Sequence, residues 1–297
     1  MNVTIIGLGL IGGSIARDLR RTKFATRLTG VEVSPEHAAK ALEIHLVDEI
    51  LPLEEALLKA DLVILAVPVD KIRDLLPAVL DLVSDRTTVT DMGSTKKEIA
   101  RMIEDHPKRR NYIAAHPMSG TENSGPEAAL EGLFDGKITI ICDHEKSAPQ
   151  HLALIEKMFQ AIGMNMAYMS SDEQDHSTAF ISHLPHAAAY ALANAVQTKE
   201  DRSIIFDLAS GGFRSTVRLA KSSPAMWGPI FQQNKDYVVE SLEVYIKHLI
   251  EFKESIAHDE ERMYELMENA NKIREILAGN NPSLRKNEET IVKFYTK

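Results

Sequence analysis

The chain has a single cysteine, Cys142, among its 297 residues, so no disulfide can form within it. Basic residues are also scarce, because 34 Lys and Arg stand against 43 Asp and Glu and leave a net charge of −9. That balance argues against a general binder of nucleic acid or of anionic membranes. No apolar run reaches the roughly 18 residues that span a bilayer, and a strand-like run directly after Met1 leaves no room for a signal peptide. We therefore expect a cytoplasmic protein without membrane or nucleic-acid partners.

A glycine-rich loop of sequence GLGLIGGS at residues 7–14 follows an apolar run at residues 3–6. Strand, glycine turn and helix start thus come in the order of the dinucleotide-binding fingerprint GxGxxG. Glycines let the backbone approach a pyrophosphate, and the free amides that open a helix over residues 10–21 favour its charge. The loop residues expected around the cofactor are Gly7, Gly9, Leu10, Ile11 and Gly12.

Glu32 lies twenty residues after Gly12, at the end of a second strand expected over residues 28–33. A carboxylate there can hold the ribose hydroxyls and repel a 2′-phosphate, so the pattern favours NAD over NADP. The alternative is a surface glutamate beside an ordinary glycine turn. A strand over residues 62–68 should end at the same sheet edge, which places Val67 and Pro68 beside the cofactor.

Strand-like runs alternate with amphipathic helical stretches up to residue 169, and Cys142 falls in one of these runs as a buried strand thiol. This alternation predicts a parallel sheet covered by helices, an α/β Rossmann-type dinucleotide-binding domain over residues 1–169. From residue 170 every segment has a helical pattern, beginning with a capping box expected at Ser171 and Gln174. Residues 170–297 are therefore predicted to form an all-α helical domain that ends in a polar tail over residues 278–297.

From Ile230 onward, apolar side chains recur three and four positions apart, which predicts one long amphipathic helix. A small helical domain cannot cover such a seam alone, so we expect a homodimer formed through this domain. The seam consists of Phe231, Val238, Leu242, Tyr245, Leu249, Phe252, Ile256 and Met263.

His116 follows a short strand expected over residues 112–115 and stands at its carboxyl end, in the segment HPMSG. A histidine has an unperturbed pKa near 6.5 and suits the proton acceptor of an alcohol oxidation. Its position predicts that it lies near the nicotinamide. Ser94 belongs to the loop DMGSTK after a strand expected over residues 87–91. It can cap the following helix or donate a hydrogen bond into the cofactor crevice.

Two clusters in the helical half invite a chemical interpretation. His183 and His186 in SHLPH suggest zinc, with His116 or His176 as a third ligand. However, the HExxH spacing and an acidic ligand are missing, so no metal is expected; such histidines serve more often in packing or in binding a substrate carboxylate. The second cluster is the segment GGFRSTVR at residues 211–218. The planar guanidinium of Arg218 in this segment matches a carboxylate, and the alternative is that Arg218 forms a surface ion pair. The other cations available nearby are Arg214 and Lys221.

The segments GLGLIGGS, DMGSTK, HPMSGTENSG, SHLPH and GGFR…VRLAKSSPAMW together resemble the prephenate dehydrogenase family, over roughly residues 1–277. Members of that family pair a Rossmann domain with a helical dimerisation domain. They oxidise and decarboxylate prephenate, or its transaminated relative arogenate, with NAD or NADP to make tyrosine. The resemblance implies that His116 accepts a hydrogen bond from the ring hydroxyl and that Ser94 supports this histidine and the substrate. It also implies that Arg218 grips a substrate carboxylate and that His186 lines the pocket.

The chain departs from the family at one point, because Ser215 and Val217 replace the aspartate and threonine of the common FRDxTR segment near Arg218. Two other functions share parts of the pattern. A Rossmann-plus-helical dehydrogenase of a 3-hydroxy acid would use a lysine as its base, and a non-enzymatic NAD-binding sensor would not need His116. The resemblance favours oxidation of prephenate to 4-hydroxyphenylpyruvate over both.

Overall fold

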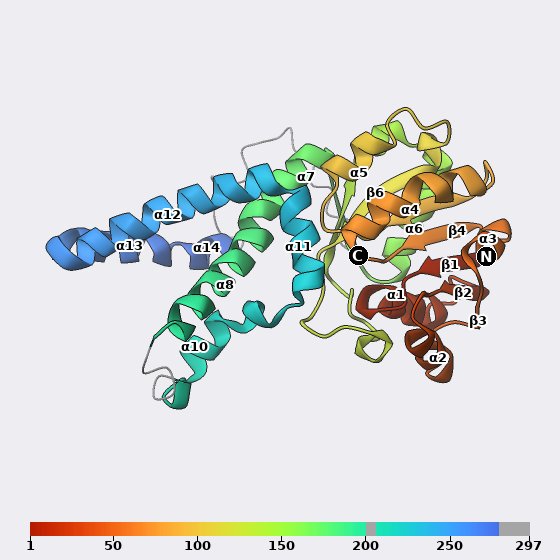
Figure 1. Cartoon of the computed structure of the whole chain (residues 1–297). Coiled ribbons are helices and arrows are strands. Elements are labelled where there is room, and N and C mark those ends of the chain that lie inside the picture. Colours follow the sequence, from red (N-terminus) through yellow and green to blue (C-terminus); the bar gives the residue numbers. More distant parts are fainter. Residues whose placement is uncertain (200–205, 279–297) are drawn as a thin grey trace.

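A computed structural model describes residues 1–199 and 206–278 of the chain. Figure 1 shows a sheet with helices on both faces in the amino-terminal half and an extended group of helices in the carboxy-terminal half. The predicted fold class, a dinucleotide-binding domain followed by a helical domain, is confirmed. The predicted polar tail lies, except for Ala278, outside the described residues.

The sheet has eight strands in the order β3-β2-β1-β4-β5-β6-β7-β8. All neighbouring strands run parallel except β6 and β7, which are antiparallel, so the prediction of a wholly parallel sheet is wrong at this one pair. The strand order reverses beside β1, where doubly wound sheets bind their ligands. The strands are β1 Asn2–Ile6, β2 Arg27–Val31, β3 Glu49–Ile50, β4 Leu62–Leu65, β5 Thr88–Asp91, β6 Tyr112–Pro117, β7 Ile138–Cys142 and β8 Asn165–Met169.

Helices cover both faces of this sheet, as the strand β4 illustrates. Its residues Leu62 and Ile64 pack into one hydrophobic cluster together with α1 and α6, while Val63 and Leu65 pack into a second cluster with α4 and α5. A strand buried on both faces reads as a continuous apolar run, which is why the sequence LVIL predicts it. The helices of this half are α1 Leu10–Arg21, α2 Pro35–Glu43, α3 Leu53–Leu58, α4 Val69–Leu82, α5 Lys97–Met102 and α6 Pro149–Ala161.

Several predicted strand ends are displaced. The strand expected over residues 28–33 ends at Val31, and Val33 is 96% exposed. The strand expected over residues 62–68 ends at Leu65, because Pro68 already serves as the N-cap of α4 and a proline has no N–H for the ladder. Cys142 is fully buried at the end of β7, as predicted.

The carboxy-terminal half is helical throughout its described residues, in agreement with the prediction. The capping box at its start lies one residue earlier than predicted, at Ser170 and Glu173. Ser171 instead donates its hydroxyl hydrogen to Asp143, and Gln174 points into the interior. The elements are α7 Ser171–Thr178, the π-helical turn η4 Ala179–His183, α8 Leu184–Gln197, α10 Gly211–Thr216, η5 Arg218–Lys221, α11 Pro224–Gln233, α12 Lys235–His258, α13 Glu260–Asn271 and α14 Ile273–Leu277.

The single long helix predicted from Ile230 is wrong, because the chain breaks it at Asn234 and again at Asp259. The side chain of Asn234 turns inward and donates to the Asp175 carbonyl over 2.7 Å, and its backbone leaves the helical range. Asp259 caps the next helix by accepting the N–H of Arg262. The predicted seam is thus divided among α11, α12 and α13, of which α13 folds back along α12 (Figure 1).

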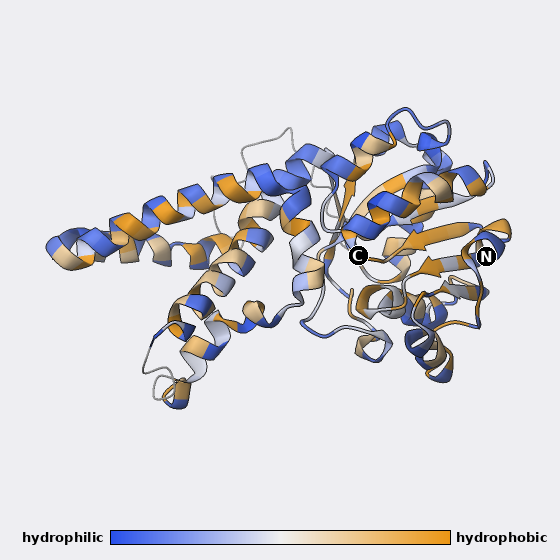
Figure 2. Cartoon of the chain, viewed as in Figure 1, coloured by the Kyte–Doolittle hydropathy of each residue, from blue (hydrophilic) through white to orange (hydrophobic). Residues whose placement is uncertain are grey.

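Much of the apolar surface of α12 remains exposed in the single chain, and Figure 2 shows orange segments along this helix. No helix within residues 1–199 and 206–278 is long and apolar enough to cross a bilayer. The exposed apolar side chains of α12 are Val239, Val244, Tyr245, Ile246, Leu249, Ile250 and Ile256.

Candidate active site

The glycine loop between β1 and α1 has the shape that a dinucleotide pyrophosphate requires. Gly7 has a φ of +92°, and a Cβ on Gly12 would collide with the Gly7 carbonyl oxygen. A Cβ on Gly9 would meet no atom within 4 Å, so the space above this residue is open. Gly9 is also the N-cap of α1. Because glycine has no side chain, the first amides of this helix have no side-chain cap. These free amides and the open space fit a bound pyrophosphate.

Glu32 follows β2 and turns back to the glycine loop. Its carboxylate accepts the N–H of Leu8 over 3.1 Å and the N–H of Ser34 over 3.0 Å. These two bonds hold the carboxylate beside the loop, where it can accept hydrogen bonds from ribose hydroxyls.

The remaining predicted cofactor residues surround the same loop. Val67 lies directly against it, because a Cβ on Gly7 would be 2.6 Å from Val67 Cγ1. Pro68 opens α4 at the same edge of the sheet. Leu10 is 9% exposed and Ile11 packs against the core, so the side chains of both residues anchor the loop to the domain.

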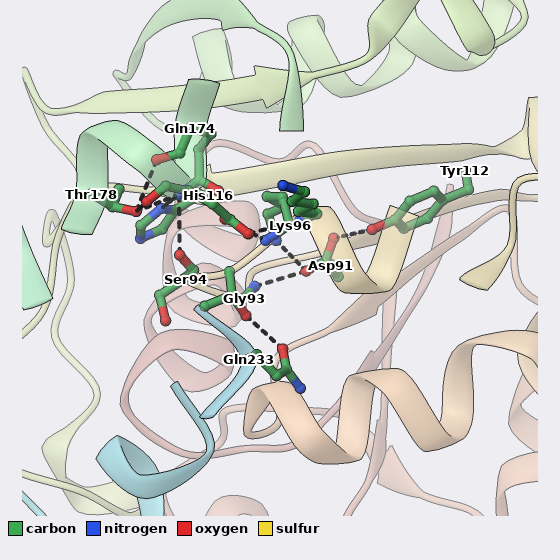
Figure 3. Close-up of polar contacts among 12 residues, drawn as sticks. Asp91, Gly93, Ser94, Lys96, Tyr112, His116, Gln174, Thr178 and Gln233 are labelled. Carbon is green, nitrogen blue, oxygen red and sulfur yellow. Dashed lines mark hydrogen bonds and ion pairs between the residues drawn. The ribbon is translucent and has the colours of Figure 1, made fainter. Parts of the chain in front are cut away.

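His116 lies within β6 and is only 8% exposed. Its Nδ1 is 3.0 Å from Nε2 of Gln174 on α7, as Figure 3 shows. Burial, assisted by the positive charge of Lys96 and by the neighbouring His183, lowers the pKa of His116 to about 3. The imidazole is therefore neutral at neutral pH, so one of its two ring nitrogens carries a free lone pair.

The loop of Ser94 rests on a buried charged group. Asp91 pairs with Lys96, accepts the hydroxyl of Tyr112 over 2.5 Å and accepts the N–H of Gly93 over 2.9 Å (Figure 3). Lys96, Asp91 and Tyr112 are fully buried, and burial beside the Asp91 carboxylate raises the pKa of Tyr112 well above its usual range. This network fixes the loop at the carboxyl end of β5.

Of the two roles expected for Ser94, the capping of the following helix is wrong. The first amides of α5, those of Lys96 and Lys97, donate to the carboxylate of Asp175 over 2.8 and 2.9 Å. A carboxylate from α7, in the helical half, thus satisfies the donors that a local serine was expected to cap. The hydroxyl of Ser94 has no hydrogen-bond partner among the described residues, while its carbonyl accepts from Gln174 over 3.1 Å.

His183 and His186 lie on the helical side of the site, against Trp227. The ring of His186 stacks on the indole, and His183 meets the indole edge at 5.9 Å between ring centroids. His183 is fully buried, and its Nδ1 is 3.1 Å from Nδ2 of Asn234. Burial lowers the pKa of His183 to about 4, with a smaller contribution from His186. Both rings are therefore held in place by packing.

Arg218 forms an ion pair with Glu122, with 3.3 Å between Nη1 and Oε2. Glu122 belongs to the loop that follows His116, so the pair connects the helical half to this loop. The Arg218 side chain is 54% exposed, and it helps to lower the pKa of nearby His186. Arg214 is exposed on α10, and its Nε donates to the Ala209 carbonyl.

The zinc alternative has no support in the residues that the structure describes, since no three His, Cys, Asp or Glu side chains there form a metal-ligating group. His176, offered as a third ligand, is exposed and packs its ring edge on Phe180 and Tyr237.

Sequence reasoning missed Gln174 and Asp175 as parts of the site, although one signal was available. On α7 the buried residues Ser171, Gln174, Asp175 and Thr178 are all polar and follow the i, i+3, i+4, i+7 spacing of a buried helix face. A polar stripe at core spacing indicates a face that hydrogen-bonds to something specific. Trp227 was noted only as part of a motif, and its stacking on His186 depends on the tertiary fold.

Comparison with known proteins agrees with this geometry. Residues 15–168 match the family described as prephenate dehydrogenase, nucleotide-binding domain, and residues 170–284 match prephenate dehydrogenase, dimerization domain. The prephenate dehydrogenase of Bacillus subtilis (strain 168) is 30% identical over 278 residues, covering 92% of this chain and 75% of the relative.

Two solved structures are similar over nearly the whole fold. Prephenate dehydrogenase from A. aeolicus, in complex with hydroxyphenyl propionate and NAD⁺, has a TM-score of 0.86 and 32% identity, covering 93% of this chain and 98% of the other. Synechocystis arogenate dehydrogenase has a TM-score of 0.77 and 29% identity, covering 93% and 100%. With both halves matched by the two domains of one family, the chain belongs to the prephenate dehydrogenase family and is an enzyme of that family.

Proposed function

We propose that this enzyme oxidises and decarboxylates prephenate with NAD, yielding 4-hydroxyphenylpyruvate, NADH and carbon dioxide. The observation that carries the proposal is His116, a buried and neutral histidine at the carboxyl edge of the sheet, facing the helical half that contributes Gln174. The fit of the glycine loop to a pyrophosphate and the carboxylate of Glu32 support NAD as the cofactor.

The dinucleotide would be held by the backbone of Gly7, Gly9 and Gly12 and by the carboxylate of Glu32, with Val67 and Pro68 at the edge of the loop. Its nicotinamide ring supplies the hydride acceptor. Every other step falls to the protein, which orients the substrate and moves one proton.

The substrate hydroxyl would donate its hydrogen to His116 as the hydride departs from the same ring carbon. Loss of carbon dioxide from the opposite carbon leaves its bonding electrons in the ring, which becomes aromatic, and His116 returns the proton to the phenolate oxygen. Ser94, whose hydroxyl has no hydrogen-bond partner among the described residues, would support the hydroxyl end of the substrate. Because aromatisation drives the decarboxylation, the protein needs mainly to position the reacting groups.

Arg218 would bind the carboxylate that is retained, since a guanidinium forms two parallel bonds with a carboxylate. His186 and His183 would line the same pocket against Trp227, and Arg214 is a second cation on the neighbouring helix. Arg218 exchanges its present partner, Glu122, for substrate at modest cost, because both side chains are partly exposed.

Two further parts of the proposal concern the organisation of the chain. We place the domain boundary between residues 169 and 170, between the end of β8 and the start of α7. We also infer a homodimer formed through the helical half, supported by the exposed apolar side chains of α12 and by the match to a dimerization domain.

The likeness to Synechocystis arogenate dehydrogenase favours arogenate as a second candidate substrate. The test is NADH formation by the purified chain from prephenate, from arogenate and from a series of 3-hydroxy acids. We expect the highest kcat/KM with prephenate and no turnover of 3-hydroxy acids. Turnover of 3-hydroxy acids alone would contradict the proposal, and a higher kcat/KM with arogenate would replace its substrate.

A further inference from the structure

We propose that Gln174 is a positioning residue that decides which ring nitrogen of His116 carries the proton, and that its carboxamide turns over to make Nε2 of His116 the proton acceptor. The inference rests on the proposed function in one respect, the role of His116 as the base. Its evidence is the hydrogen bonding around the Gln174 carboxamide.

The amide nitrogen of Gln174 stands among three acceptors. Nε2 of Gln174 is 3.1 Å from the Ser94 carbonyl oxygen, 3.0 Å from His116 Nδ1 and 3.3 Å from Thr178 Oγ1 (Figure 3). A carbonyl only accepts and an amide nitrogen only donates, so the Ser94 carbonyl holds the nitrogen end of the carboxamide on this side. Nδ1 of His116 must then accept, and the neutral ring carries its proton on Nε2.

In this arrangement the second ring nitrogen of His116, Nε2, is a hydrogen-bond donor. Its Nε2 has no hydrogen-bond partner among the described residues and is the ring nitrogen left for a ligand. An Nε2–H can donate to an oxygen but cannot take the proton of a substrate hydroxyl. The oxidation therefore needs the other tautomer, with the proton on Nδ1 and the lone pair on Nε2.

The opposite end of the same carboxamide supplies what that tautomer requires. Oε1 of Gln174 is buried and has no hydrogen-bond partner within the described residues, and a buried acceptor without a donor is unfavourable. If the carboxamide turns over, Oε1 accepts Nδ1–H of His116, and the ring proton moves from Nε2 to Nδ1 through solvent. The turn breaks the bonds from Nε2 to the Ser94 carbonyl and to Thr178 Oγ1. Because two carbonyl oxygens cannot hydrogen-bond to each other, the Ser94 carbonyl must also shift away from Oε1, and Ser94 is a residue that we place at the substrate.

The other charged and titratable groups near His116 do not determine which ring nitrogen carries the proton. Lys96 and His183 both disfavour a second proton on the ring, but neither hydrogen-bonds to it. Asp175, the neighbour of Gln174, is occupied by the amides of Lys96 and Lys97. The choice of tautomer is therefore left to Gln174.

The first experiment needs no variant. Nitrogen NMR of the ¹⁵N-histidine-labelled full chain, with the His116 signals assigned by their loss in His116→Gln, should show the proton on Nε2 in the free enzyme. It should show the proton on Nδ1 when NAD⁺ and 4-hydroxyphenylpyruvate are bound together. The proton on the same nitrogen in both states would overturn the turnover of the carboxamide.

The second experiment changes Gln174. Gln174→Met has similar volume and no hydrogen-bonding groups, so kcat should fall about tenfold or more, while KM for NAD stays within about twofold. In Gln174→Glu, the ionised carboxylate can only accept a hydrogen bond, so it should keep the proton of the His116 ring on Nδ1. Its negative charge should also move the acidic limb of the kcat profile upward by about one pH unit or more. The control is Gln160→Glu, which adds the same charge at an exposed position of α6 and should leave both readouts unchanged.

Unchanged kcat and an unchanged acidic limb in both Gln174 variants would refute the positioning role. A failure of the proposed function can be told apart from a failure of this inference. If His116 is not the base, His116→Ala keeps its turnover, whereas the NMR measurement of the proton on Nδ1 or Nε2 still tests the role of Gln174.

Discussion

The imidazole of His186 stacks on the indole of Trp227, with 3.5 Å between ring centroids and 23° between the ring planes. Its Nδ1–H donates to the Ser182 carbonyl over 2.9 Å, which leaves Nε2 as an acceptor. Burial lowers the pKa of His186, and the neighbouring Arg218 lowers it further. The ring is therefore neutral at neutral pH, and the positive charge beside it belongs to Arg218.

Replacement of Arg218 by alanine should raise KM for prephenate about 10- to 100-fold and leave KM for NAD nearly unchanged. Removal of one partner of a buried charge pair weakens binding by about 2 to 5 kcal/mol. The loss of substrate affinity should be smaller here because Arg218 is partly exposed and already paired with Glu122. Arg218→Lys should restore only part of the affinity, since an ammonium keeps the charge but not the two-point contact. Steady-state kinetics with each substrate varied in turn would measure both constants.

Arg214→Ala is the comparison variant, because Arg214, an exposed arginine on neighbouring α10, is the other candidate for the carboxylate anchor. We expect it to leave KM for prephenate within about threefold, as surface cations contribute little. If Arg214→Ala raised KM and Arg218→Ala did not, the carboxylate anchor would be Arg214 and the assignment from the family motif would be mistaken.

His116→Ala should lower kcat about 10²- to 10⁴-fold with little change in NAD affinity, the usual range for loss of a general base. Because the pKa of His116 is about 3 in the free enzyme, protonation of this ring should reduce kcat/KM only well below pH 6. The control is His176→Ala, an exposed histidine on α7. Turnover of His116→Ala within about threefold of the parent would transfer the role to His183 or His186.

How far the sequence predicts this fold depends on how much each element repeats a local pattern. The strand Leu62–Leu65 is buried on both faces and reads as an unbroken apolar run, whereas β3, Glu49–Ile50, has two residues and no periodicity to recognise. The apolar spacing along residues 231–263 is real, but the break at Asn234 depends on the distant Asp175 carbonyl. Periodicity reports which face is apolar, and tertiary hydrogen bonds decide where a helix ends.

Some residues of the candidate site can likewise be predicted from local sequence patterns, whereas others depend on the tertiary fold. The glycine loop and His116 are predictable because their chemistry demands particular residue types beside a strand end. The partner of His116 is not, since 58 residues separate it from Gln174. The local sequence also offers two capping registers, Ser170 with Glu173 and Ser171 with Gln174, and the structure uses the first. The side chain that would have closed the second register lies against His116 instead.

NAD should be preferred over NADP by at least about tenfold in kcat/KM, equivalent to about 1.4 kcal/mol. The carboxylate of Glu32, held by the amides of Leu8 and Ser34, would repel a 2′-phosphate, and no cation forms an ion pair with it among the described residues. Glu32→Gln should lower the preference at least about threefold, while Glu36→Gln, at an exposed position of α2, should not change it. Equal kcat/KM with the two cofactors in the parent enzyme would contradict this prediction.

Acid should destabilise the fold through its buried histidines. Their pKa values, about 3 for His116 and about 4 for His183, lie below the ordinary 6.5, so the unfolded chain gains protons first as the pH falls. Stability is then lost from about pH 6.5 downward, by up to about 1.4 kcal/mol per pH unit for each histidine. Burial raises the pKa of Asp175 to about 6, which offsets part of this loss.

The test is denaturant unfolding at pH 7.5 and at pH 5.5 for the parent and for His183→Gln, which keeps an acceptor for Asn234 but cannot titrate. The difference in unfolding free energy between the two pH values should be smaller in the variant by about 1 kcal/mol. An equal pH dependence in both proteins would show that His183 does not titrate as described.

The chain should form a dimer through α12 at micromolar concentration. Residues such as Ile246, Leu249 and Ile250 are about half exposed in the single chain. Full burial of an exposed side chain of this size contributes about 1.5 to 3 kcal/mol, so covering the exposed half contributes about half of that. Several such residues from each of two subunits, related by a two-fold axis, are sufficient for a stable pair.

The double substitution Leu249→Glu and Ile250→Glu should give a monomer in light scattering, because it would bury four carboxylates in the interface. The control, Leu58→Glu, changes a side chain on α3 that is 79% exposed and should leave the dimer intact. A parent chain that scattered as a monomer would disprove the dimer, and a dimer that survived the double substitution would place its interface away from these residues of α12.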